Sequence, residues 1–231
     1  MRLNRYIASL GISSRRKADE IIQNKRVRIN GVITTDFSYA VSETDTLEID
    51  GKPVKATPKI SKVIAFHKPA GVVCSHHDKH AEKTIFELLP AEFRRYAIAG
   101  RLDENSRGLV LLSNDGDLVQ KISHPNYQKE KEYIVTVRDE EDESRLSYLF
   151  TSGITDEGEV LRVKKMEKLE RTVWRITLDY GKKRHIRRMF QSIGNHVYDL
   201  LRVRIGEISI FQPELPELQY RQLVLTEKEN L

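Results

Sequence analysis

The sequence predicts an α/β protein of the α+β type, built from two parts. A small helix-helix-strand domain comes first, and a larger body with a mixed, largely antiparallel sheet flanked by helices follows. Three observations support this: positive charge is concentrated in the first quarter of the chain, a segment rich in proline and lysine follows it, and strand-like stretches then outnumber helical ones. The expected boundaries are 1–52 for the small domain, 53–62 for a linker and 63–231 for the body.

In the small domain, apolar residues recur at helical spacing over residues 3–10, and Gly11 then ends the helix. Ser13 or Ser14 can cap a second helix, because a hydroxyl at that position accepts a bond from a free backbone amide. An Asn-Gly pair is the strongest short hairpin signal. The expected strands are 26–29 and 32–33, joined by that pair, and 46–49.

The body has many strand-like segments and few intervening helices, which favours a mixed or largely antiparallel sheet over a doubly wound nucleotide-binding fold. Cys74 is the only cysteine, so no disulfide can form within the chain, and we interpret it as a small buried hydrophobe in a strand. Strands are expected at 63–67, 71–75, 96–99, 108–112, 131–138, 159–166, 172–179 and 202–210. Helices are expected at 82–89, 116–123, 141–150 and 183–193.

The charge distribution indicates a polyanionic partner for the small domain. Residues 1–62 contain twelve Lys and Arg against seven Asp and Glu, whereas residues 63–231 contain twenty-seven of each. Arg15, Arg16 and Lys17 crowd the first turn of a helix, where the helix dipole disfavours cations unless an external anion compensates them. A solvated basic face is the alternative from charge alone. Neither a membrane-length apolar run nor a signal peptide is seen, so a cytoplasmic location is expected.

The small domain resembles the S-four-type RNA-binding domain. The resemblance is carried by residues whose type and spacing agree together: Arg2-Leu3, Gly11, Ser14-Arg15, Ala18, Ile22, Arg26-Val27 and Asn30-Gly31. In that family the helix pair and the adjoining basic residues lie against structured RNA. The resemblance therefore implies RNA contacts by Arg5, Arg15, Arg16, Lys17 and Arg28.

The segment from Ala99 to Gly116 places Arg101 and Asp103 in a polar loop between two apolar strands. Charged side chains at the edge of buried structure can have a tuned pKa and reactivity. From the residues alone, Asp103 could equally be a carboxylate that caps the loop.

Four ordered motifs of the body resemble the RsuA-type ribosomal RNA pseudouridine synthases. They are His67-Lys68-Pro69-Ala70-Gly71, the segment Gly100-Arg101-Leu102-Asp103 with its continuation to Gly116, Lys131-Glu132-Tyr133, and Gly181 to Met189. The resemblance implies that Asp103 is the catalytic aspartate and that Arg101 helps to fill the gap left by a flipped nucleotide. It also implies that Tyr133 stacks on the target uracil. The residues alone predict only an aromatic side chain in the core or on the face of a strand. Lys68 is assigned to RNA binding.

The helix predicted at 183–193 carries an apolar stripe that ends at Ile193. On a helical wheel Arg187 lies at the border of this stripe, while Arg184 and Arg188 lie far round toward solvent. The wheel therefore lets Arg187 reach a half-buried site, and leaves Arg184 and Arg188 to meet phosphate or to remain solvated. The resemblance implies that Arg187 is the ion-pair partner of Asp103.

The implied reaction converts uridine to pseudouridine in ribosomal RNA, within an assembling ribosomal subunit, and needs no cofactor or metal. His76, His77 and His80 cluster without acidic or cysteine partners, so a metal site there is not expected. A non-catalytic RNA-binding assembly factor is the rival function, and an intact set of Asp103, Tyr133 and Arg187 argues against it. A monomer is expected. Lys183, His185 and His67 depart from the family pattern, which leaves the target nucleotide and the ribosomal subunit open.

Overall fold

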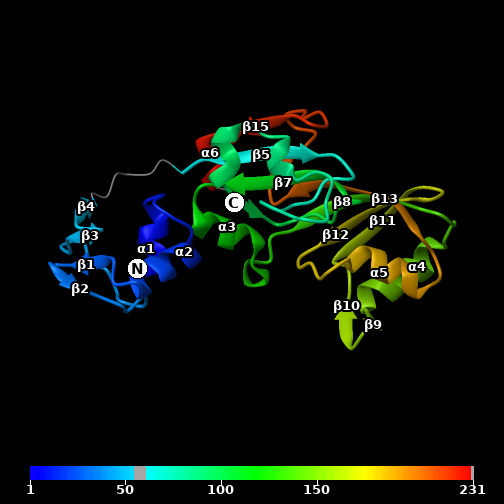
Figure 1. Cartoon of the computed structure of the whole chain (residues 1–231). Coiled ribbons are helices and arrows are strands. Elements are labelled where there is room, and N and C mark those ends of the chain that lie inside the picture. Colours follow the sequence, from blue (N-terminus) through cyan, green and yellow to red (C-terminus); the bar gives the residue numbers. More distant parts are fainter. Residues whose placement is uncertain (55–60, 230–231) are drawn as a thin grey trace. The chain divides into compact units, whose positions relative to one another are not determined.

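The computed structural model describes residues 1–54 and 61–229 and divides the chain into two compact units, Met1–Ser61 and Lys62–Leu231 (Figure 1). The last strand of the first unit, β4 (Lys52–Val54), includes the first residues of the expected linker. Residues 55–60 of that linker lie outside the described residues.

The small unit packs two helices, α1 (Leu3–Ser9) and α2 (Arg15–Gln23), with a short four-stranded sheet. Ser14 is the N-cap of α2, and its hydroxyl accepts a 3.2 Å bond from the Lys17 amide, as predicted. The expected hairpin is also confirmed, with Asn30 and Gly31 both at positive φ in the turn. The four strands of this sheet pair in the order β2-β1-β3-β4. Their bounds are β1 (Val27–Ile29), β2 (Val32–Ile33) and β3 (Leu47–Ile49), with β4 as given above.

The larger unit is built on one mixed sheet of nine strands. Every pairing within it is antiparallel except that between β7 and β13, so the predicted fold class is confirmed. Seven strands follow the order β11-β12-β8-β13-β7-β5-β15, while β6 pairs with β7 and β14 with β13. The bounds are β5 (Val63–Lys68), β6 (Ala97–Ala99), β7 (Arg107–Ser113), β8 (Lys131–Val137), β11 (Lys165–Glu170), β12 (Val173–Leu178), β13 (Val197–Ile205), β14 (Ile208–Ser209) and β15 (Tyr220–Gln222).

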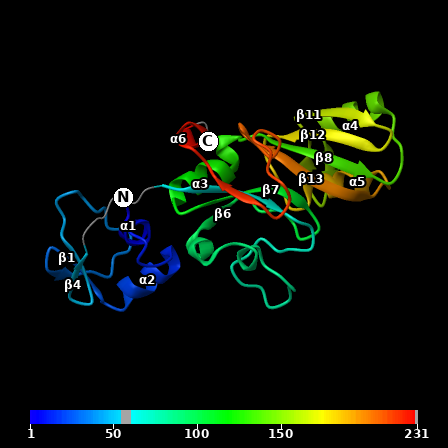
Figure 2. The ribbon, with the colours of Figure 1, turned by 90° about the horizontal axis from the view of Figure 1, so that it is seen from above.

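Both faces of this sheet are covered, which explains the long apolar runs in its central strands. Along β7, Val110 and Leu112 face one core cluster, whereas Leu109 and Leu111 face the other. Figure 2 shows α4 and α5 beside the β11-β12-β8-β13 part of the sheet, with α3 near β7. The helices are α3 (Gly116–Ser123), α4 (Glu143–Ser152), α5 (His185–Ser192) and α6 (Leu225–Glu229); the 3-10 turns are η1 (Ile85–Glu87), η2 (Ala91–Arg95) and η3 (Pro125–Tyr127); and a separate hairpin joins β9 (Ile154–Asp156) to β10 (Glu159–Leu161).

Four element predictions were wrong. The strand expected at 202–210 is divided between β13, which begins at Val197, and β14. The expected strand 71–75 is a loop whose Val73 makes only an isolated bridge to Thr84. Val72 and Cys74 are nevertheless buried, so the apolar pattern indicated burial and not a strand. The expected helix 82–89 reduces to the short turn η1, and the expected strand 159–166 divides between β10 and β11.

Gly108 allows the only parallel contact of the sheet to form. Its φ is +110°, and it lies opposite Arg202 in the β7–β13 pairing. A Cβ added there would lie 2.2 Å from the carbonyl oxygen of Arg202 and 2.6 Å from its amide nitrogen. Because these are backbone atoms within a sheet, neither can move aside cheaply.

We expect Gly108→Ala to lower the free energy of unfolding by roughly 2 kcal/mol or more, through the clash and the positive φ. Gly116→Ala is the matched control, since a Cβ there meets nothing within 4 Å, and it should leave stability unchanged or slightly higher. Urea unfolding can be followed by the fluorescence of Trp174, the only tryptophan, which is fully buried. Equal effects at the two glycines would contradict the close approach.

Candidate active site

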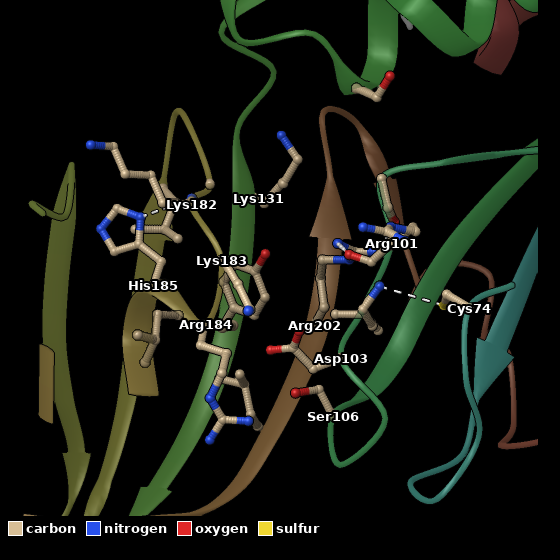
Figure 3. A pocket seen from close by; sticks show the side chains of 18 of the residues that line it. Cys74, Arg101, Asp103, Ser106, Lys131, Lys182, Lys183, Arg184, His185 and Arg202 are labelled. Carbon is tan, nitrogen blue, oxygen red and sulfur yellow. Dashed lines mark hydrogen bonds between the residues drawn. The ribbon is translucent and has the colours of Figure 1, made fainter. Parts of the chain in front are cut away.

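A pocket of about 690 Å³ opens beside strands β8 and β13 of the larger unit. Figure 3 shows Arg101, Asp103 and Ser106 on one wall and Lys182, Lys183, Arg184 and His185 on the opposite wall, with Lys131 and Arg202 on the strands between them. The pocket is therefore assembled from two loops, 100–106 and 180–185, that are far apart in the sequence. Tyr133 and Cys74 also line it.

Asp103 projects from the first wall and remains partly exposed. Its backbone carbonyl accepts a 3.1 Å bond from the Ser106 amide, which tightens the loop. Its carboxylate makes no ion pair or hydrogen bond with the described residues. A carboxylate that is held in place by its backbone and has no bound side-chain partner is available to a ligand in the pocket.

Arg202 fixes this loop from below, and the sequence prediction missed it. The side chain is 1% exposed, and its guanidinium donates bonds to three carbonyl oxygens: Leu109 at 2.8 Å, Gly100 at 2.7 Å and Arg101 at 3.4 Å. An arginine inside the apolar strand 200–205 was the available signal, since a charge is rarely buried without a purpose.

Lys68 is directed into the protein, so the predicted direct contact with RNA was wrong. It is fully buried, and its Nζ donates to the carbonyl oxygens of Pro69 at 2.7 Å and Glu104 at 3.1 Å. Burial lowers the pKa of Lys68 to about 8. The side chain thus holds the Asp103 loop from within the protein.

Lys131 is a half-buried lysine that the sequence prediction did not assign to the site. It lies on β8 and lines the pocket, and its Nζ donates a 2.9 Å bond to the Lys129 carbonyl. Burial, and then the charge of Arg202, lower the pKa of Lys131 to about 8. Its place two residues before Tyr133, on the same face of the strand, was the signal available in the sequence.

Arg187 does reach a half-buried position, but it forms no ion pair with Asp103. Its guanidinium donates to the carbonyl oxygens of Asn105 and Val197, each at 2.8 Å. Burial, and then Arg184, lower the pKa of Arg187, while the charges of Asp103 and Asp199 act in the opposite direction. Arg187 therefore acts on Asp103 at longer range and holds the loop two residues away.

The two neighbouring arginines of α5 differ from each other. Arg184 is exposed, lines the pocket and has a left-handed backbone with φ of 53°. Arg188 was predicted to face solvent and RNA, and this was wrong: its guanidinium is bound by Asp156 at 2.5 Å and Glu159 at 2.7 Å. Those carboxylates belong to the β9–β10 hairpin, which covers the face of the helix that the wheel leaves to solvent.

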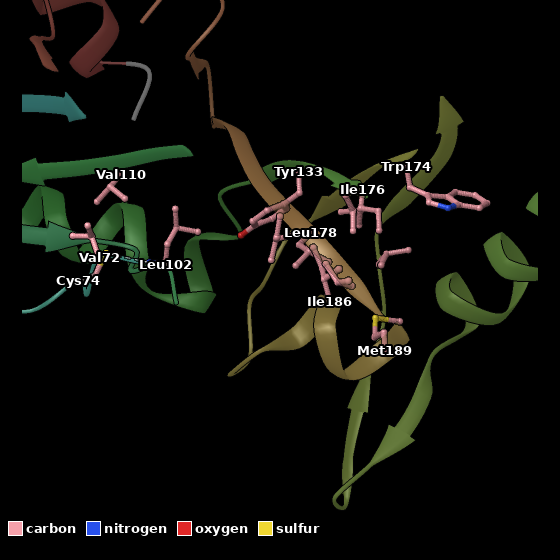
Figure 4. Packing of buried hydrophobic residues seen from close by; sticks show 14 of the residues in the cluster. Val72, Cys74, Leu102, Val110, Tyr133, Trp174, Ile176, Leu178, Ile186 and Met189 are labelled. Carbon is pink, nitrogen blue, oxygen red and sulfur yellow. Dashed lines mark hydrogen bonds between the residues drawn. The ribbon is translucent and has the colours of Figure 1, made fainter. Parts of the chain in front are cut away.

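Tyr133 lies on β8 with its side chain 7% exposed. Figure 4 shows it packed near Leu178 and Ile186 in the core cluster beneath the pocket. The ring therefore has a fixed position while part of it still lines the pocket. Stacking of this ring on a base stays a prediction.

The remaining predicted residues lie on accessible surface or outside the pocket. Arg101 is exposed at its rim. In the small unit Arg15, Arg16, Lys17 and Arg28 are exposed, and Arg5 is half-buried. His76 stacks on Phe86 with ring centroids 4.0 Å apart. Within residues 1–54 and 61–229, no three His, Cys, Asp or Glu side chains are grouped so that they could hold a metal.

Comparison with known proteins decides the family. Residues 62–192 match the family described as RNA pseudouridylate synthase, and residues 1–47 match the S4 domain. The chain belongs to the RNA pseudouridylate synthase family. A crystal structure of a pseudouridylate synthase is 31% identical and superposes with a TM-score of 0.72, covering 100% of this chain and 99% of that one. The pocket therefore lies in the catalytic domain of an isomerase family.

Two curated relatives of this pseudouridylate synthase chain match over most of their length. An Aquifex aeolicus protein named uncharacterized RNA pseudouridine synthase is 30% identical, covering 100% of this chain and 96% of that protein. Ribosomal large subunit pseudouridine synthase B of Bacillus subtilis is 31% identical, covering 87% and 84%. Other relatives are longer, and the chain spans 44% of the protein of the same name from Xanthomonas campestris. In the described part of the chain, every helix is too short or too polar to cross a membrane.

The buried Lys68 gives this pseudouridylate synthase domain a defined pH response. Because its pKa falls from 10.5 to about 8 on folding, the unfolded chain holds the proton more tightly and protonated Lys68 opposes folding below pH 8. Between pH 8 and 10.5 this penalty disappears. The wild type should therefore gain stability relative to Lys68→Met over that range, by on the order of 1 kcal/mol or more. Urea unfolding at several pH values measures the difference, and a constant difference would contradict the burial of the charge.

Proposed function

We propose that this protein converts a uridine of ribosomal RNA to pseudouridine, with Asp103 as the essential carboxylate. The observation that carries the proposal is the way three cations fix the loop of Asp103 while leaving its carboxylate free. Arg202, Lys68 and Arg187 all donate to backbone oxygens between Gly100 and Asn105. A reactive group held in one position needs no reorganisation when a substrate binds.

The chemistry explains why an aspartate is needed there. The reaction breaks the bond between nitrogen one of uracil and the ribose, turns the base, and joins it again through carbon five. Asp103 can add covalently to the sugar or the base, or it can remove a proton from the sugar and stabilise the positive charge that develops. The target must leave its stack to reach the pocket, as other bases modified by enzymes do.

Ribosomal RNA as the substrate is supported by the names of the relatives and by the basic residues of the small unit. Several of those relatives are named for the large ribosomal subunit, so we propose large-subunit RNA, acted on in the cytoplasm by a monomer during subunit assembly. A purely RNA-binding assembly role is not favoured, because the chain belongs to an enzyme family. Mapping pseudouridine in both ribosomal RNAs, in cells with and without this protein, tests the substrate directly.

Asp103→Asn should lower the rate of pseudouridine formation by roughly a thousandfold or more, because the amide can neither act as a nucleophile nor accept the proton. Glu104→Gln is the matched control: Glu104 is the neighbouring carboxylate of the pocket and is exposed. That variant should retain most of the activity. Single-turnover conversion of the mapped RNA measures the activity of both variants. Near-normal conversion by Asp103→Asn would contradict the assignment of Asp103 as the essential carboxylate.

Tyr133 can be tested by separating its ring from its hydroxyl. If the ring only stacks, Tyr133→Phe should keep most of the activity, whereas Tyr133→Ala should lose a stacking energy of about 1–3 kcal/mol. If the hydroxyl also helps to remove the proton from carbon five, the phenylalanine variant should bind RNA normally and release tritium slowly from carbon-five-labelled RNA. Melting curves control for the cavity that alanine leaves in the core. Full activity of the alanine variant would exclude Tyr133 from the site.

A further inference from the structure

A second hollow of about 390 Å³ lies next to the active-site pocket, and Arg184 lines both. Arg138, Arg184 and Arg187 line this second hollow, and no acidic residue does. The other lining residues are Gln191, Gly194, Asn195, His196 and Val197. The hollow is therefore a cationic depression that adjoins the site where a uridine would be isomerised.

Among the described residues, only one of the three arginines that line the second hollow is paired with a carboxylate. Arg138 is paired with Asp139 at 2.7 Å. The side chain of Arg184 makes no ion pair or hydrogen bond with the described residues, and the guanidinium of Arg187 donates only to neutral oxygens. The nearby Asp199 is already bound by Arg107 at 2.7 Å. Two guanidinium groups thus lie close together without a bound carboxylate.

The guanidinium groups of Arg184 and Arg187 repel each other, and a bound anion would offset this repulsion. The pKa of Arg187 is lowered, first by burial and then by Arg184, which shows that the two charges oppose each other. In addition, the Nε of Arg187 is a buried polar atom without a hydrogen-bond partner. An anion bound between the arginines would offset the repulsion, and phosphate suits guanidinium groups because it accepts their paired hydrogen bonds.

We propose that the second hollow binds a phosphodiester group of the substrate RNA, next to the uridine that enters the active-site pocket. This inference rests on the proposed function. An RNA strand carries a phosphate beside every base, so a nucleotide in the first pocket places a neighbouring phosphate close to Arg184. The shared arginine makes the two hollows continuous subsites for one strand. The hollow then fixes the register of the strand relative to the active-site pocket.

Gln191 offers a substitution that tests the hollow without removing an arginine. It lies four residues after Arg187 on α5 and is exposed, so Gln191→Glu places a carboxylate within reach of that guanidinium. We expect the affinity for RNA to fall by roughly tenfold, as for loss of one charged hydrogen-bonding contact. Gln222→Glu makes the same change on β15, which lies at the opposite end of the strand order from β11, and should change affinity by less than about twofold.

The probe is a short labelled RNA with one central uridine flanked by adenosines, bound to the full chain and measured by fluorescence anisotropy. A set of the same RNAs replaces one phosphate at a time by a neutral methylphosphonate. If the hollow binds one particular phosphate, neutralising that phosphate should weaken binding to the wild type and abolish the difference between wild type and Gln191→Glu. Neutralising any other phosphate should leave that difference intact. Melting temperatures confirm that the variants are folded.

Three outcomes would overturn the proposal. The first is equal RNA affinity of Gln191→Glu and Gln222→Glu, and the second is a loss of RNA affinity in Gln191→Glu that no single methylphosphonate abolishes. The third is that Gln191→Glu weakens the binding of inorganic phosphate but not the binding of RNA. The second would indicate diffuse repulsion, and the third would assign the hollow to a free anion. Binding at equilibrium requires no turnover. A wild type that binds in this way but makes no pseudouridine would reject the proposed function and leave the phosphate subsite standing.

Discussion

A buried guanidinium is the constraint on which the pocket depends. Arg202 can be fully buried only because three carbonyl oxygens surround its charge, and two of them, at Gly100 and Arg101, belong to the loop that carries Asp103. It can reach them only because Gly108 lets β13 approach β7 closely. Leaving a buried charge without partners is costly, so the loop and the strand fix each other. The position of Asp103 is thus a consequence of how two central strands pack.

Two lysines held within the protein also contribute positive charge at the pocket. Lys68 and Lys131 have a pKa of about 8, so both are mostly charged at neutral pH although burial opposes it. Their Nζ groups are bound by carbonyl oxygens and not by carboxylates. Fixed positive charge in a partly enclosed site attracts a polyanion and acts over a longer range than any one contact. The exposed cations at the rim add to this field, whereas Lys68 also helps to hold the loop that carries Asp103.

The sequence predicted the parts of the site that a local pattern encodes. The loop of Asp103, the strand of Tyr133 and the half-buried position of Arg187 follow from strand and helix periodicity within one segment. Arg188 and Lys68 could not be predicted in this way. A helical wheel does not show that the β9–β10 hairpin covers Arg188 with two carboxylates, nor does a motif show that Lys68 is directed inward. The role of Arg202 was hidden for the same reason, because its partners lie about a hundred residues earlier in the chain.

Helix α5 connects the Asp103 loop to the second hollow because it presents two kinds of residue on adjoining faces. Ile186, Met189 and Phe190 are buried in the core, which fixes the helix as a rigid element. Arg184 and Arg187 emerge beside that stripe and line the second hollow. Arg187 also binds the carbonyl of Asn105 in the Asp103 loop. A ligand that binds this guanidinium in the hollow therefore acts on the Asp103 loop through one hydrogen bond. A phosphate bound there would help to position the carboxylate of Asp103 as well as the RNA strand.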